Sequence, residues 1–314
     1  MKYDFTTILD RRGHDAISVD GLGKMPGFTP DAPREGFDPI PMWIADMSFP
    51  TAPSIVEAMR ERLDHPCFGY FQPTDAYFDS IINWHKVRNG VQGLLPEHIG
   101  YENGVLGGVV SALNVVCSRG DKVLVHSPTY IGFTMSLKNS GYDIVHSPLH
   151  LDENNVWRMD FEDMEKKLRE GNIHAAIMCN PHNPCGRVWE RWELEKAMEL
   201  YKKYDVYVVS DEIWSDLMMN GHKHIPTQSV SEDARQRTAA FYAPSKTFSH
   251  RLQQVVAGPH QQGELPVPLQ QHERAVHARP HRGLQAGGAG VAGRAPGGPL
   301  RQHQLRLRLH RKAL

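Results

Sequence analysis

Three polar side chains with distinct chemistry each follow a short apolar segment of the chain. They are the amide of Asn183, the carboxylate of Asp211 and the amine of Lys246, which follow the segments 175–179, 206–210 and 239–243. An amine can attack a carbonyl carbon or carry a proton, and a carboxylate can hold a positive charge. Each pattern alone is typical of a turn or a helix cap, but their order along the chain is improbable by chance.

A glycine-rich turn, Glu102–Gly108 (ENGVLGG), opens an apolar helix predicted at 107–117. The free N–H groups and the dipole of a helix N-terminus suit a phosphate group. The sequence thus supplies an amine, a carboxylate, an amide and a candidate phosphate site.

The elements that must position these groups alternate along the chain. Apolar patterns predict strands at 122–126, 143–146, 175–179, 206–210 and 239–243, and helices at 53–63, 75–87, 107–117, 131–139, 160–170 and 190–204. Strands that alternate with helices predict an α/β fold, with a mostly parallel sheet covered on both faces. Ligands of such sheets bind at the carboxyl ends of the strands, where the three polar residues fall.

Composition excludes several classes of protein. The chain has 314 residues, 40% hydrophobic and 23% charged, as in soluble globular proteins. No stretch approaches the roughly 20 apolar residues that cross a bilayer, so no membrane partner is expected. The N-terminus lacks a signal-peptide pattern, so we expect a cytoplasmic location. The four cysteines form no C-x-x-C pair, so no metal site and no disulfide framework are expected.

The net charge of −1 hides two unlike parts. Residues 1–248 contain 25 Lys and Arg against 34 Asp and Glu, whereas residues 249–314 contain 10 against 2. This tail has no aromatic residue and no isoleucine, so it can bury little apolar area to offset its ordering entropy. It is a disordered basic tail, a nucleic-acid arm or a segment translated in the wrong frame. Without aromatic rings to stack on bases, no nucleic-acid partner is expected.

Several stretches of the first 248 residues resemble one enzyme family. They are MWIADMSFPTAP (42–53), FGYFQPTDAYF (68–78), SPTYIGF (127–133), CNPHNPCGRVW (179–189), VVSDEIWSDL (208–217) and APSKTF (243–248). They resemble the fold-type-I pyridoxal-phosphate (PLP) enzymes of the aminotransferase class I/II superfamily, within it the MalY/PatB-type cystathionine β-lyase branch. Cys185 stands where the family's NPxNPTG turn has threonine. The resemblance implies the aspartate-aminotransferase-like large domain, incomplete at its C-terminus, and PLP as cofactor.

The resemblance also implies a role for each candidate residue. Lys246 would form a Schiff base with the cofactor and shuttle the Cα proton of the substrate, and Asp211 would keep the pyridine nitrogen protonated. The other implied cofactor contacts are Asn183 at the ring hydroxyl, Tyr130 stacked on the ring, Gly104, Val105, Leu106 and Ser245 at the phosphate, and Tyr70 of the partner subunit in a homodimer. Asp46 and Trp214 would border the substrate.

The implied reaction is the cleavage of cystathionine or a related cysteine S-conjugate to a thiol, pyruvate and ammonia. Two alternatives stay open: an aminotransferase on the same fold, whose motifs are nearly the same, and an inactive truncated fragment. A small-molecule sulfur amino acid is the expected partner.

The expected domains are an N-terminal arm or small-domain segment at 1–45, an incomplete PLP-binding domain at 46–248, and the basic tail at 249–314. Codons chosen for the tail and read one base later permit SHYNNMSVLSMHALIGAYKPEG, which resembles the same lyase branch. We therefore expect the tail to be frameshifted and disordered, with a slip near 248–250. An exposed apolar sheet edge would then make the product poorly stable.

Overall fold

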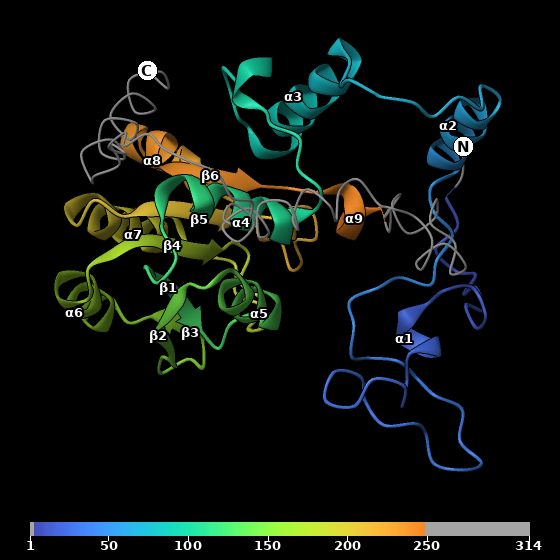
Figure 1. The fold of residues 1–314 in the computed structure, drawn as a ribbon, viewed down its shortest axis with the longest axis horizontal. Helices are drawn as coiled ribbons and strands as arrows, with labels where there is room; N and C mark the ends of the chain where they lie inside the picture. The colour runs from blue at the N-terminus through green and yellow to red at the C-terminus, as the bar shows by residue number, and fades with distance from the viewer. Residues whose placement is uncertain (1–2, 249–314) are drawn as a thin grey trace, which may run out of the picture. The chain divides into compact units, whose positions relative to one another are not determined.

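Strands of residues 3–248, the part that the computed structural model describes, form one six-stranded sheet in the order β3-β2-β1-β4-β5-β6 (Figure 1). Their bounds are β1 (Lys122–Ser127), β2 (Asp143–Leu151), β3 (Trp157–Met159), β4 (Ile173–Cys179), β5 (Tyr207–Asp211) and β6 (Thr238–Phe241). Every neighbouring pair is parallel except β2 and β3, which pair antiparallel. The prediction of a mostly parallel sheet is confirmed.

Two apolar cores lie on the two faces of this sheet. One contains side chains of α4 and α5, and the other contains side chains of α6, α7 and α8. The helix bounds are α1 (Ile17–Asp20), α2 (Pro53–Leu63), α3 (Asp75–Asn89), α4 (Val105–Val116), α5 (Ile131–Ser140), α6 (Phe161–Gly171), α7 (Arg191–Lys203), α8 (Glu232–Arg237) and α9 (Pro244–Thr247), with short 3-10 helices η1 (Pro96–His98) and η2 (Thr227–Ser229).

The central strands are apolar on both sides because both sides are covered. In β1, Val123 and Val125 join the core with α4 and α5, while Leu124 between them joins the core with α6 and α7. Successive side chains of a strand point to opposite faces, so a continuous apolar run is what a doubly covered strand requires.

Some element boundaries differ from the predictions. β2 extends to Leu151 rather than to residue 146, because it pairs there with β3, a three-residue strand that the local pattern did not reveal. Helix α4 begins at Val105, two residues before the predicted start. Within this helix, Gly108 leaves room for Phe241 of β6, since a Cβ on Gly108 would stand 2.3 Å from a ring carbon of Phe241.

The described residues divide into two units. One contains residues 3–10 and 42–248 and holds the sheet, and residues 11–41 belong to the other, where the Gly23 N–H donates to the Pro30 carbonyl (2.9 Å). The three-part division expected from the sequence stays a prediction, and its tail lies outside the described residues. Among residues 3–248, no helix has the length and apolar character needed to span a bilayer.

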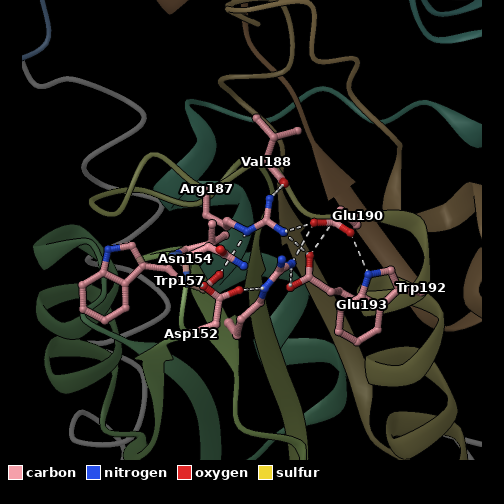
Figure 2. Close-up of polar contacts among 10 residues, drawn as sticks. Asp152, Asn154, Trp157, Arg187, Val188, Glu190, Trp192 and Glu193 are labelled. Atoms are coloured by element: carbon pink, nitrogen blue, oxygen red, sulfur yellow. Dashed lines mark hydrogen bonds and ion pairs between the residues drawn. The ribbon is translucent and has the colours of Figure 1, made fainter.

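A buried ion-pair cluster anchors the turn that carries Asn183 (Figure 2). Arg187 pairs through its backbone with His182 across the turn, and its guanidinium lies 2.5 Å from the carboxylate of Glu193 in α7. Arg158 of β3 approaches the other oxygen of Glu193 at 3.2 Å. Glu193 is fully buried, and it also accepts a hydrogen bond from the Glu190 N–H at the start of α7. One carboxylate therefore joins the turn, β3 and α7.

Replacing Glu193 with glutamine is expected to lower the free energy of unfolding by about 2 kcal/mol, because buried hydrogen bonds to a charged carboxylate are lost, while Arg187 and Arg158 keep Glu190 as a partner. Urea unfolding of the chain measures it. The matched control is Glu195→Gln on the same helix, where the carboxylate is exposed and lies 3.6 Å from Arg191, and it should change little. Equal effects of the two variants would contradict the assignment.

Candidate active site

The ends of β4, β5 and β6 bring the three predicted polar segments to one edge of the sheet. These strands are neighbours, and Asp211 at the end of β5 is in register with Cys179 on one side and Phe241 on the other. Beyond β4, the Asn180 N–H donates to the Asp211 carbonyl at 2.9 Å. The amide, carboxylate and lysine segments therefore leave the sheet side by side, as the strand-end argument predicts.

Asp211 is a buried carboxylate, 5% exposed. The pKa of Asp211 is raised to about 6, mainly by burial, and the charge of Glu212 acts in the same direction. A hydrogen bond from the Ile213 N–H (3.1 Å) and the charge of Lys246 act to lower it. Among residues 3–248, no cation lies within ion-pair distance of its oxygens. Such a group gains from any ligand that brings a positive charge or a proton to it.

Lys246 lies in α9, the short helix after β6. Its Nζ donates to the Ala45 carbonyl at 2.9 Å and stands 5.1 Å from the centre of the Trp214 ring. Trp214, predicted at the substrate, thus lies beside the lysine. Asp46, the other predicted substrate residue, directly follows Ala45 and is exposed. The half-buried Ser245 precedes the lysine in α9.

The predicted phosphate site is the N-terminus of α4. Gly104 precedes the helix with φ of +84°, a left-handed conformation that favours glycine, and the space where a Cβ would stand is open. The N–H groups of Val105 and Leu106 lie in the first turn, where a helix supplies no acceptor of its own. The start of α4 therefore presents donors and partial positive charge, with open space at the position of Gly104.

Tyr130 directly precedes α5, with its ring edge-on to Phe133 at 5.5 Å. A Cβ on Gly132 would lie 2.3 Å from a Tyr130 ring carbon and 2.9 Å from a methyl carbon of Leu106. The missing side chain of Gly132 lets Tyr130 meet the first turn of α4. Sequence reasoning missed Gly132, although its place in SPTYIGF, two residues after the tyrosine, was a usable signal.

Asn183 lies half-buried in the turn after β4, where its N–H donates to the sulfur of Cys179 at 3.4 Å. Cys185, in place of the family's threonine, is also half-buried, and burial raises the pKa of its thiol. The turn is thus fixed at two points, by Cys179 from the strand and by Arg187 from the ion-pair cluster.

Tyr70 is the predicted residue that belongs to none of the elements described above. It is in the segment between α2 and α3, and its side chain is fully exposed. Its expected role in a partner subunit stays a prediction. Sequence reasoning also missed a buried hydrogen-bond network around Glu212, because three of its partners lie 12 to 30 positions away along the chain.

The comparisons with known proteins point to one family. Residues 38–250 match the family model described as aminotransferase class I and II. Cystathionine beta-lyase PatB of Bacillus subtilis (strain 168) is 40% identical over 240 residues, which are 76% of this chain and 59% of PatB. Protein MalY of Escherichia coli (strain K12) is 28% identical over 79% of this chain and 60% of its own length.

Two solved structures agree in fold. The PLP-bound C-S lyase from Staphylococcus hominis superposes with a TM-score of 0.70 at 32% identity, over 79% of this chain and 61% of that chain. Cystalysin from Treponema denticola, whose structure contains pyridoxal 5'-phosphate, gives 0.72 at 33% identity over the same shares. The chain therefore spans about 60% of the length of the relatives it matches.

Proposed function

Since the chain belongs to the aminotransferase class I and II family, we propose that it is a PLP-dependent carbon–sulfur β-lyase. Its substrate is cystathionine or a related cysteine S-conjugate, and its products are a thiol, pyruvate and ammonia. The observation that carries the proposal is the meeting of Lys246, Asp211 and the start of α4 at one sheet edge. Two relatives that are named as lyases, at 40% and 32% identity, support the choice of reaction.

The residues present fit PLP. The cofactor carries an aldehyde, a pyridine nitrogen, a ring oxygen and a phosphate, and the edge supplies an amine, a carboxylate, an amide and a helix N-terminus. Asp211 is buried without an ion-pair partner among the described residues, and the open space at Gly104 leaves room before the first turn of α4. The donor set therefore matches the cofactor group by group.

When bound, PLP supplies an electron sink for negative charge at the substrate Cα. Lys246 Nζ takes the proton from that carbon, a role supported by its nearness to Asp211, since its charge acts to lower the pKa of that carboxyl. The Asp211 carboxylate holds a proton at the pyridine nitrogen by its charge, in a buried setting where charge pairs act strongly. Val105, Leu106 and Ser245 hold the phosphate.

The side walls of the site orient the bound groups. Tyr130 covers one face of the cofactor ring, and Asn183 donates to the ring oxygen. Trp214 and Asp46 border the substrate beside the lysine, supported by the 5.1 Å approach of Nζ to the Trp214 ring. The β-carbon–sulfur bond then breaks with the electron pair leaving on sulfur, and water completes the release of pyruvate and ammonia.

A homodimer in the cytoplasm is part of the proposal, with Tyr70 reaching the phosphate of the other subunit. The exposed rings of Phe68, Tyr70 and Phe71 support it, because a cluster of exposed aromatic side chains marks a surface that a partner covers.

The direct test is to incubate the full chain with PLP and cystathionine and to measure pyruvate and homocysteine. The proposal predicts the two products in equal amounts, with one ammonia for each. Transfer of the amino group to an added keto acid without pyruvate would show an aminotransferase instead, and bound PLP without turnover would show an inactive fragment. Light scattering of the same preparation should give the mass of two chains, and the mass of one chain would contradict the dimer.

A further inference from the structure

Glu212 is a fully buried carboxylate beside Asp211, and the reaction outlined above does not use it. It accepts four hydrogen bonds: from Ser210 Oγ (2.8 Å), the Thr227 N–H (3.0 Å), His224 Nε2 (2.6 Å) and the Tyr242 hydroxyl. Few buried side chains collect so many donors, and each donor orients the carboxylate further.

The donors come from three separate parts of the chain. Ser210 lies in β5, His224 precedes η2, Thr227 is the first residue of η2, and Tyr242 follows β6. The backbone adds a fifth bond, from the Glu212 N–H to the Phe241 carbonyl at 2.9 Å. Glu212 is thus bonded to the β6–α9 connection through both its backbone and its side chain.

The charge state of Glu212 follows from these bonds. Burial acts to raise the pKa of its carboxyl, but the hydrogen bond and charge of His224 and the hydrogen bonds of Tyr242 and Thr227 hold that pKa below its ordinary value. The Tyr242 hydroxyl stays a donor, because burial and the Glu212 charge raise its pKa well above its usual value. The pair is therefore a charge-assisted hydrogen bond, which is stronger than a neutral one.

This bond links the segments that carry the two central groups of the site. Glu212 directly follows Asp211, and Tyr242 precedes Lys246 by four residues. On the other side of the lysine, Thr247 Oγ1 donates to Asp216 at 2.9 Å. The turn of Lys246 is therefore held on both sides by carboxylates of the segment that follows β5.

We propose that Glu212 and Tyr242 are positioning residues, which fix the Lys246 turn at its distance from Asp211 through the bond between the carboxylate and the phenol. The proposed reaction gives neither residue a contact with substrate or cofactor. The bond between Glu212 and Tyr242 is present in the chain without cofactor. Its effect on PLP attachment rests on the proposed function.

Tyr242→Phe tests the bond with little change in shape. The ring remains packed against His85 of α3, whose ring centre lies 4.3 Å away. The matched control is Tyr201→Phe. It removes a buried hydroxyl of α7 that lies 3.3 Å from Nε2 of His126. Both variants lose one hydroxyl hydrogen bond, but only the first loses the hold on the Lys246 turn.

The first readout is amide hydrogen exchange of the cofactor-free chain. In Tyr242→Phe, peptides that cover 241–248 should exchange about tenfold faster than in the wild type, the factor expected from a lost hydrogen bond to a charged group. In Tyr201→Phe the same peptides should be unchanged. Unchanged exchange in Tyr242→Phe would overturn the proposal, whether or not the chain binds PLP.

The second readout is the rate at which added PLP becomes attached to Lys246, trapped by borohydride and measured by mass spectrometry. Attachment should be about tenfold slower in Tyr242→Phe than in Tyr201→Phe, because a looser turn presents the amine less often. Equal rates would contradict the positioning role. If the wild-type chain attaches no PLP, the proposed function fails, and the exchange result alone decides on the hold of the turn.

Discussion

Replacing Lys246 with alanine is expected to abolish the covalent attachment of PLP and to lower pyruvate release from cystathionine by about 10³-fold or more, since both the amine that binds the cofactor and the group that moves the Cα proton are removed. Asp211 cannot substitute for the lysine, because a carboxylate does not form the covalent bond with the cofactor aldehyde that an amine forms. Borohydride trapping of attached PLP with mass spectrometry and a pyruvate assay measure the two losses.

Two comparison variants separate the loss of the amine from the loss of its positive charge. Lys246→Arg keeps a cation that lowers the pKa of Asp211 but should lose attachment and activity as completely as alanine. Lys138→Ala removes an exposed lysine near the end of α5 and should leave both unchanged. Persistent covalent attachment of PLP in Lys246→Ala would show that another residue holds the cofactor.

Replacing Asp211 with asparagine is expected to stop the reaction and, at the same time, to stabilise the cofactor-free chain above pH 6. The amide cannot hold a proton at the pyridine nitrogen, so pyruvate release should fall by about 10³-fold. The amide can still accept the hydrogen bond of the Ile213 N–H, so the fold keeps its local contact while the buried charge is removed.

The pH dependence gives the sign of the stability change. The pKa of Asp211 is raised from 3.8 to about 6, so its contribution to folding is fully present below pH about 4 and is lost as the pH rises through 6. That loss is about 3 kcal/mol for a shift of about two pKa units. Asparagine does not titrate, so the stability difference between variant and wild type should grow by about this amount between pH 4 and pH 8.

Urea unfolding of the two cofactor-free proteins across this pH range measures the difference. Asp143→Asn, at the exposed start of β2, is the control and should show no such pH dependence. A difference that stays constant from pH 4 to pH 8 would contradict the raised pKa of Asp211. Stability gained where activity is lost would show that burial of this carboxylate serves the cofactor.

The strand-end residues could be predicted from the sequence because their signal is local. A polar residue directly after an apolar strand, as at Asp211, falls at the carboxyl edge of any parallel sheet. The same reasoning placed Lys246 after β6, and the fold class follows from the alternation of strands and helices. The glycine-rich turn predicted the N-terminus of α4, although the helix starts two residues earlier.

The contacts between distant segments could not be predicted in this way. Glu212 bonds to Tyr242, 30 positions away, and no periodicity of either segment indicates that pairing. Strand β3 depends on its antiparallel contact with β2 rather than on its own three residues. The frame of the basic tail, the role of Tyr70 and the residues at the substrate stay predictions.

The most direct test of the central claim is to locate the PLP attachment site on the chain. The full protein is incubated with PLP, reduced with borohydride, digested and analysed by mass spectrometry. We expect the pyridoxyl phosphate group on the peptide that contains Lys246, and we expect that peptide to be unlabelled when Lys246 is replaced by alanine. A label on any other lysine, or no label at all, would contradict the assignment of this sheet edge as a PLP site.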